Sequence, residues 1–188
     1  MNIYLTSYGV DTRYKDYMNS YKDIIRVLKN KNVAIIPNAK LVSEDRTNSN
    51  VAKEELTKNG INSKIIDLNM QDLNIERYNA LYLSGGEPKN LMDSIIKSNN
   101  YEIIKNFIDN GGIIIGQSAG AMIFNKNYLD TTTGELLIMG NGFDYYDKII
   151  VPHYDNLPNE LLNKIPRNIL KINDNDNLYK LDIKRKSK

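Results

Sequence analysis

A serine between two glycines is the first feature of this sequence that suggests chemistry. Segment 111–124 reads GGIIIGQSAGAMIF, so Ser118 lies between Gly116 and Gly120 in a Gly-x-Ser-x-Gly pattern. An apolar run precedes the pattern and another follows it, which predicts a strand, a tight turn and a helix. A serine on such a turn is a nucleophile elbow, whose hydroxyl is exposed at the edge of a sheet.

A simpler interpretation of Ser118 is that it caps the helix that follows. A cap explains neither Gly116 nor the small residues on either side of the serine. We therefore expect Ser118 to be a nucleophile, with the backbone N–H of Ala119 directed toward an oxyanion that forms beside it.

A serine hydroxyl needs a base to take its proton, and the chain has a single histidine, His153. The apolar run KIIV and Pro152 precede it, which is typical of a strand that ends at a sheet edge. An imidazole can accept a proton and return it near neutral pH. We expect His153 to lie within hydrogen-bonding distance of Ser118.

The third member of such a site is a carboxylate, which orients the imidazole and stabilises its charged form. Spacing alone does not choose among the acidic residues that lie between the serine and the histidine. The candidates are Asp130, Glu135, Asp144 and Asp147.

The second half of an oxyanion hole is expected from Gly85 and Gly86, which follow an apolar run and precede a predicted helix. Amides without side chains can approach a substrate carbonyl closely. A plain strand-to-helix turn or a phosphate-binding loop would use the same residues. The Gly-x-Gly-x-x-Gly and Walker patterns are absent, which makes a nucleotide site the weaker interpretation.

These residues need a scaffold that brings strand ends together. Apolar runs alternate with segments of helical periodicity, which predicts an α/β fold with a mostly parallel sheet and helices on both faces. The carboxyl ends of parallel strands are where ligand sites collect. Strands are expected at 2–8, 32–39, 63–69, 78–86 and 111–117, and helices at 14–30, 43–60, 87–112 and from 119 onward.

Beyond residue 127 the alternation weakens. Segment 130–155 is typical of turn-rich β structure, and segment 169–183 predicts a hairpin around the tip NDNDN. Asp174 and Asp176 alternate there as in a calcium loop, but the glycine and the glutamate of such a loop are missing. We interpret the segment as a hairpin tip.

Size and composition fit one folded domain over residues 1–188, with a frayed tail expected at 181–188. A net charge of +2 gives no reason to expect nucleic acid or a membrane as partner. The chain has no cysteine, which excludes a thiol nucleophile and a Cys-based zinc site, and we expect no metal or organic cofactor. Without a long apolar segment or a basic leader, the sequence predicts a cytoplasmic protein of undetermined oligomeric state.

Four stretches of the sequence resemble the dipeptidase E (α-aspartyl dipeptidase) family of serine peptidases, with cyanophycinase as a more distant relative. In order, they are IYLTSYG, LYLSGGEPKNLM, GGIIIGQSAGAM and IIVPHYD, and together they cover residues 1 to about 160. The resemblance implies the class I glutamine amidotransferase-like superfamily and its flavodoxin-like three-layer sandwich. Most members of that superfamily use a cysteine nucleophile, so the absence of cysteine agrees with a serine branch.

The resemblance also implies roles for individual residues. Ser118 would be the nucleophile and His153 the general base, and the oxyanion amides would be those of Gly86 and Ala119. Family members carry an acid shortly after a Thr-Thr pair, which favours Glu135 in TTTGE as the third member.

One position and one region depart from the family pattern. Glu87 stands where relatives often have Asn or Asp after the paired glycines. The region after His153 is short and diverged. In aspartyl dipeptidases a basic side chain beyond the histidine binds the acidic group of the substrate, and the resemblance makes Arg167 its nearest equivalent here, with Gly85 as a second substrate-binding candidate.

The sequence as a whole predicts a serine peptidase that acts on small peptides, with Asp-X dipeptides as one substrate class. An esterase or amidase with the same triad is one alternative. A non-catalytic, ligand-binding member of the superfamily is the other.

Overall fold

A six-stranded sheet forms the centre of the molecule in the computed structural model, which describes residues 1–14, 16, 19–41, 46–130 and 137–182. The strand order is β10-β1-β5-β4-β2-β3. Neighbouring strands are parallel, except that β10 runs antiparallel to β1 at the edge. The strands are β1 (Asn2–Thr6), β2 (Asn32–Ile36), β3 (Asn62–Ile65), β4 (Ala80–Leu83), β5 (Ile113–Gln117) and β10 (Tyr179–Lys180).

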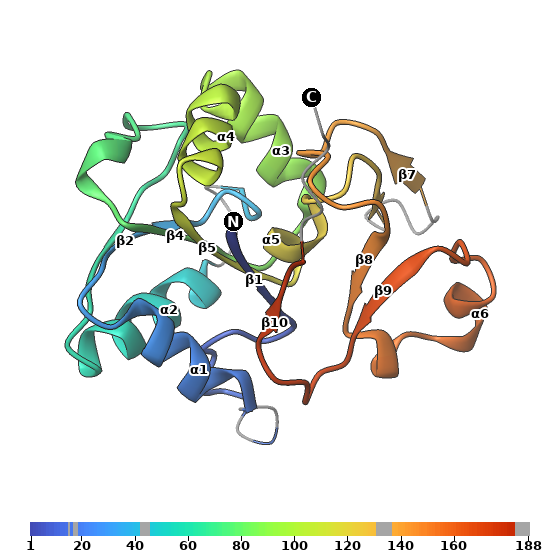
Figure 1. The fold of residues 1–188 in the computed structure, drawn as a ribbon. Coiled ribbons are helices and arrows are strands. Elements are labelled where there is room, and N and C mark those ends of the chain that lie inside the picture. Colours follow the sequence, from blue (N-terminus) through green and yellow to red (C-terminus); the bar gives the residue numbers. More distant parts are fainter. Residues whose placement is uncertain (15, 17–18, 42–45, 131–136, 183–188) are drawn as a thin grey trace.

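Helices cover both faces of this sheet (Figure 1). On β2, Val33 and Ile35 pack in the cluster that contains the buried residues of α1 (Asn19–Leu28) and α2 (Thr47–Lys58). The alternate residues, Ala34 and Ile36, pack in the cluster of the other face. That cluster includes α3 (Pro88–Lys97), α4 (Tyr101–Asp109) and α5 (Ala119–Met122). The predicted three-layer α/β sandwich is confirmed.

A smaller region lies beside the central sheet, next to β10 in Figure 1. It contains two pairs of strands, one antiparallel and one parallel, and a short helix. Its elements are β6 (Tyr128–Asp130), β7 (Leu137–Met139), β8 (Ile149–Pro152), α6 (Asn159–Leu162) and β9 (Ile169–Ile172). Single 3-10 turns occur at η2 (Ile75–Arg77) and η3 (Tyr154–Asn156).

The hairpin predicted over 169–183 is wrong. β9 pairs in parallel with β8, whereas β10 pairs with β1 of the central sheet. The predicted tip is therefore a crossing between the two sheets, and it places Asp174 in the interior, with 3% of its surface exposed. Each strand of the supposed hairpin found a partner more distant in the sequence.

The helix predicted from residue 119 onward is short. It ends at Met122, and the carbonyls of Ile123 and Phe124 instead accept hydrogen bonds from the N–H groups of Phe143 and Tyr145. This pairing replaces the helical hydrogen bonds that would otherwise continue α5.

The frayed tail was expected to begin at residue 181, which is too early. Leu181 is 2% exposed, and its N–H donates to the carbonyl of Ile3 at 2.9 Å. Residues 183–188 of the expected tail lie outside the described residues.

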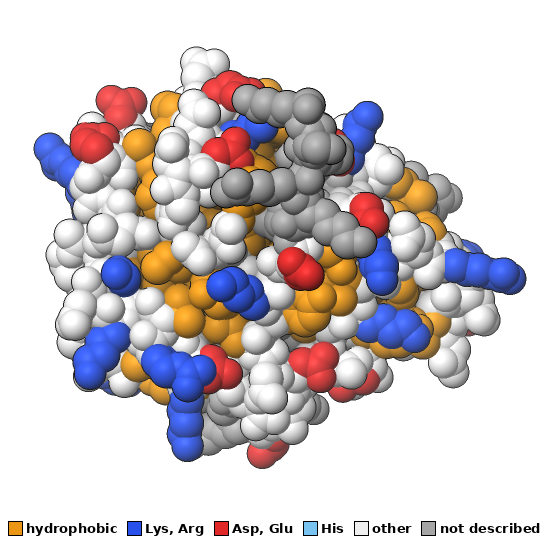
Figure 2. Space-filling model, viewed as in Figure 1, with side chains coloured by type: hydrophobic (Ala, Val, Ile, Leu, Met, Phe, Trp, Pro, Cys, Tyr) orange, Lys and Arg blue, Asp and Glu red, His pale blue; other side chains and the backbone are white. Residues whose placement is uncertain are grey.

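Charged side chains of both signs are interspersed on the face of the molecule shown in Figure 2, which agrees with the nearly balanced net charge. Among the residues that the structure describes, we found no helix with the length and apolar character needed to cross a membrane.

Candidate active site

Ser118 lies on the turn between β5 and α5, as the pattern predicts. Its backbone has φ 48° and ψ −111°, a region that non-glycine residues seldom occupy. Such a strained conformation is a feature of functional sites. It lets the chain reverse sharply, so that the serine projects from the end of a central strand.

The two glycines around Ser118 are required because the arms of the turn touch. A Cβ on Gly116 would lie 2.5 Å from the carbonyl oxygen of Gly120. A Cβ on Gly120 would overlap the backbone oxygen of Leu83 on β4. The helix-cap interpretation does not account for these contacts, whereas a nucleophile elbow requires them.

The structure brings His153 to this serine. His153 follows β8, and its Nε2 lies 3.1 Å from Ser118 Oγ. Its backbone has a left-handed φ of 55°, which turns the imidazole back toward the central sheet. The N–H of His153 donates to the hydroxyl of Ser7 at 3.1 Å, and this bond ties the end of β8 to the end of β1.

Asp174 contacts the other nitrogen of the imidazole. Its Oδ1 lies 2.5 Å from His153 Nδ1, and its side chain is fully buried. Its Oδ2 accepts a hydrogen bond from Asn156 Nδ2, and its backbone N–H donates to Asp155 at 2.9 Å. A buried carboxylate on Nδ1 leaves Nε2 of a neutral imidazole free to accept a proton from the serine.

Asp174 lies beyond the histidine, outside the interval between Ser118 and His153 in which the acid was expected. Glu135, the favoured residue, lies outside the described residues. Asp144 and Asp147 line a different hollow with Tyr145 and Tyr179, and none of the residues described around that hollow lines a cavity at Ser118. In the sequence, Asp174 is marked only by its place in the segment NDNDN, which was interpreted as the tip of a hairpin.

Gly86 lies beside the serine in a conformation that favours glycine, with φ 149°. A Cβ there would be 2.5 Å from the carbonyl oxygen of Ala39, which accepts the N–H of Glu87 at 2.7 Å. No hydrogen bond joins the N–H of Gly86 or Ala119 to another part of the described chain. Both amides are therefore available to a substrate oxygen.

Gln117 connects the loop after β1 with β4 and with the loop that follows β4, a role that no sequence pattern predicted. Its Nε2 donates to the carbonyl of Tyr8 at 2.8 Å. Its Oε1 accepts from the Tyr82 hydroxyl at 3.2 Å and from the N–H of Gly85 at 3.4 Å. Burial raises the pKa of the Tyr82 hydroxyl well above its ordinary value, so that this group remains a neutral donor.

Tyr8 and Ser7 support the histidine from the end of β1. The Tyr8 ring meets the imidazole edge to face, with centroids 4.8 Å apart, and stacks on Tyr14 at 4.2 Å. The Ser7 hydroxyl also lies 3.3 Å from the carbonyls of Ile172 and Asn173, directly before Asp174. One small side chain thus contacts the segments that carry both the imidazole and the carboxylate.

Two cavities meet at Ser118, His153 and Gly86. The first, the apolar cavity, has a volume of about 190 Å³. The second, the polar cavity, has a volume of about 130 Å³. The remaining wall of the apolar cavity is Glu87, Pro88, Met122, Leu129, Val151, Pro152, Leu157, Leu161 and Ile165, and that of the polar cavity is Ser7, Tyr8, Asp11, Tyr14, Asn48, Gly85 and Gln117.

The predicted substrate-binding residues divide between these places. Gly85 lines the polar cavity, where Asp11 is paired with Arg13 at 2.5 Å. Arg167 is exposed and lines neither cavity. The structure thus brings Gly85 to the serine and leaves Arg167 away from it.

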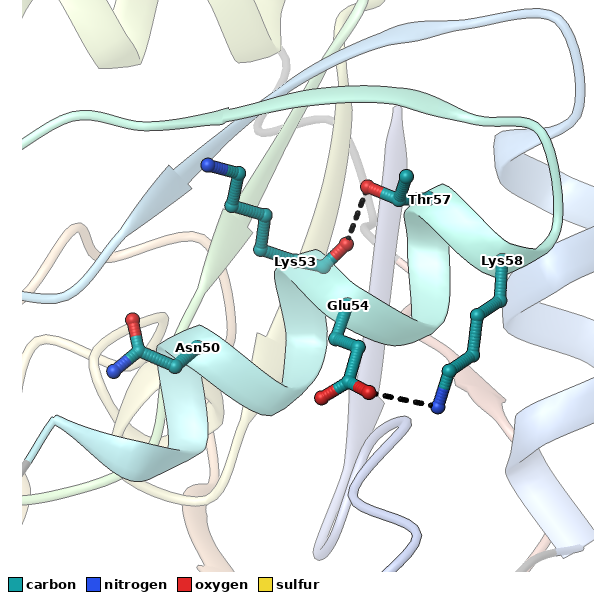
Figure 3. A pocket seen from close by; sticks show the side chains of 5 residues that line it. All are labelled: Asn50, Lys53, Glu54, Thr57 and Lys58. Carbon is teal, nitrogen blue, oxygen red and sulfur yellow. Dashed lines mark hydrogen bonds and ion pairs between the residues drawn. The ribbon is translucent and has the colours of Figure 1, made fainter.

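A further hollow of about 470 Å³ lies on the outer face of α2 (Figure 3). Its wall comes from one helix, and its Lys58 pairs with Glu54 at 3.0 Å, four residues earlier. Such a pair is typical of a solvated helix face. Within the described ranges, no cluster of three or more His, Asp or Glu side chains could hold a metal ion.

Comparison with known proteins places the chain among peptidases. The model of peptidase family S51 matches residues 3–183. An uncharacterized peptidase of Pasteurella multocida is 26% identical over 156 residues, 77% of this chain and 75% of that protein. An uncharacterized peptidase of Listeria monocytogenes is 27% identical over 176 residues, 87% of this chain and 83% of that protein.

Two solved structures share the fold. A candidate peptidase E protein from Listeria monocytogenes has a TM-score of 0.70 at 24% identity, over 92% of this chain and 90% of the other. A peptidase from an acI-B1 Actinobacterium has a TM-score of 0.59 at 20% identity, over 88% and 72%.

Proposed function

Because this chain belongs to peptidase family S51, a family of serine peptidases, we propose that it hydrolyses short peptides through Ser118, His153 and Asp174. One observation carries the proposal: the serine hydroxyl, the imidazole and a buried carboxylate form an unbroken line of contacts, 3.1 Å and 2.5 Å long. This is the geometry that a serine nucleophile needs for activation by a base.

Each proposed step uses a group of this chain. His153 Nε2 takes the proton of Ser118 as Oγ attacks the scissile carbonyl. The amides of Gly86 and Ala119 donate to the oxyanion that forms. His153 then gives its proton to the leaving amine, and water hydrolyses the acyl-enzyme by the reverse route. Asp174 holds the imidazole in the required tautomer throughout.

The cavities support a short substrate. Sites for drug-sized ligands have volumes of about 300–1,000 Å³. At about 190 and 130 Å³, the apolar and polar cavities each fit about one residue. They meet at the serine, so a peptide of two or three residues would fill both.

A preference for Asp-X dipeptides has less support. Such a preference needs a cation beside the scissile bond, and the resemblance offered Arg167 for that role. No lysine or arginine is among the described residues that line either cavity.

A fluorophosphonate probe tests the proposed nucleophile. The folded protein should be labelled at Ser118, mapped by mass spectrometry, and the Ser118→Ala and His153→Ala variants should lose the label. A folded protein that takes no label at neutral pH would contradict the proposal and favour a ligand-binding role. Labelling without cleavage of any short peptide would instead favour an esterase or amidase.

A further inference from the structure

We infer that the substrate carries a bulky apolar side chain directly beside the scissile bond, and that the apolar cavity accepts this side chain and rejects acidic ones. The inference rests on the proposed function, since it concerns a residue that flanks the bond attacked by Ser118.

The wall of the apolar cavity is hydrophobic on several sides. Leu129 and Val151 are 4% and 3% exposed and belong to an internal apolar cluster. Met122, Leu157 and Ile165 are partly buried and pack against the same cluster. The cavity is therefore an open end of a small hydrophobic core, and an apolar side chain that enters it leaves water for a comparable environment.

The charges around the apolar cavity disfavour an acidic side chain. Glu87 and His153 are the ionisable residues among the described ones that line it. A carboxylate placed there would lose hydration without gaining a lysine or arginine partner, and it would lie near the carboxylate of Glu87. Selectivity thus comes from rejection of acids as well as attraction of apolar groups.

The position of the cavity fixes which side chain it accepts. Its wall includes Ser118, His153 and Gly86, the groups proposed to contact the scissile bond. A side chain inside it must therefore belong to a residue joined by that bond. The polar cavity shares the same three residues and is left to the polar remainder of the substrate.

Four dipeptides test the inference: Leu-Ala against Asp-Ala, and Ala-Leu against Ala-Asp. In one of the two pairs, we expect kcat/KM to be at least 100-fold higher for the peptide with leucine than for the peptide with aspartate. The pair that shows this preference identifies the side of the scissile bond on which the apolar cavity lies. A preference below tenfold in both pairs would overturn the inference.

A wall variant and a matched control test the cavity directly. Ile165→Ala should lower kcat/KM for the preferred leucine peptide about tenfold, because a pocket discriminates by the methylene groups that it contacts. Ile103→Ala, on α4 and lining neither cavity, should leave that value unchanged. Equal effects of the two variants would overturn the inference.

The labelling rate of Ser118 by a small fluorophosphonate separates this inference from the proposed function. A protein that is labelled and cleaves peptides without regard to leucine contradicts the inference alone. A folded protein that is not labelled contradicts both.

Discussion

The carboxylate of Asp174 has both oxygens engaged, one by His153 and the other by Asn156, and this fixes its orientation behind the imidazole. Asp176, two residues later, instead accepts the N–H of Asn173 at 2.7 Å in an exposed turn. Asp174 therefore contacts the imidazole, whereas Asp176 only stabilises an exposed turn. A substitution at Asp176 is thus a matched control for the same substitution at Asp174.

We predict that Asp174→Asn lowers kcat about 10⁴-fold, because an amide leaves the imidazole in the wrong tautomer. Steady-state kinetics on the best peptide substrate measure the effect. Asp176→Asn is the control, and its kcat should remain within about threefold of the wild-type value. A larger loss from Glu135→Gln than from Asp174→Asn would return the acid role to Glu135.

A residue of the site could be predicted where a short sequence pattern marks it, and could not where its role depends on distant parts of the chain. Ser118 was found because an elbow requires its glycines at fixed offsets, and His153 because the chain has one histidine. Asp174 was not found, because its partner is set by the route of the chain between two sheets. No local pattern encodes that route.

Between elements, α5 and β4 approach each other closely at the elbow, where Gly120 contacts the backbone of Leu83. We predict that Gly120→Ala lowers the free energy of unfolding by about 3 kcal/mol, because the backbone atoms that it meets cannot move aside. Urea denaturation measures the change. Gly140→Ala, whose Cβ would meet its nearest neighbour at 3.6 Å, should have a much smaller effect.

A hydrogen bond from the Tyr21 hydroxyl of α1 to the buried carboxylate of Glu55 links α1 to α2. The hydrogen bond from Lys58 is the main cause that lowers the pKa of the Glu55 carboxyl below its ordinary value of 4.5, opposed by burial and aided by bonds from Tyr21 and Thr12. A lowered pKa stabilises the fold above pH 4.5, and that contribution is lost as the pH falls through the pKa of the folded state.

We predict that Glu55→Gln lowers the free energy of unfolding by about 1 kcal/mol at pH 7, and that its difference from the unchanged protein shrinks below pH 4.5. Urea denaturation at both pH values measures it. Glu54→Gln removes a partner of the same Lys58 from an exposed position and should change little. If Glu55→Gln lowered the free energy of unfolding by the same amount at low pH as at pH 7, the charge of the Glu55 carboxylate would not be the cause of the stabilisation.

The order of strands and helices through β5 followed from the sequence, because each element has its own apolar period. The short strands after residue 127 did not. β9 and β10 have four and two residues, so their pairing depends on distant partners more than on their own composition.

For the whole molecule, the last strand joins the smaller region to the central sheet. β10 pairs with β1, and the buried Leu181 follows it. We predict that truncation after Leu178 lowers Tm by about 5–10 °C and abolishes activity, although the serine, histidine and Asp174 all remain. Thermal unfolding and peptide cleavage measure both effects.

The control for this truncation is removal of residues 183–188 alone, which should leave Tm and activity unchanged. If the longer truncation were as active as the full chain, the closing strand would not be needed to align the site.

The three-layer architecture was predictable because it depends on alternation summed over many elements. The placement of the smaller region beside the sheet was not, since it depends on a few contacts such as that between Ser7 and His153.

One excursion of the chain, residues 153–174, carries the imidazole, the carboxylate and the cavity-wall residues Leu157, Leu161 and Ile165. The serine and its two glycines lie on β5, the turn after it and α5, outside this segment. The groups proposed to transfer the proton and part of the apolar cavity wall therefore lie on one continuous segment of the chain. If the proposed function holds, exchanging residues 153–174 for those of a homologue should change the peptide preference while Ser118 remains in place.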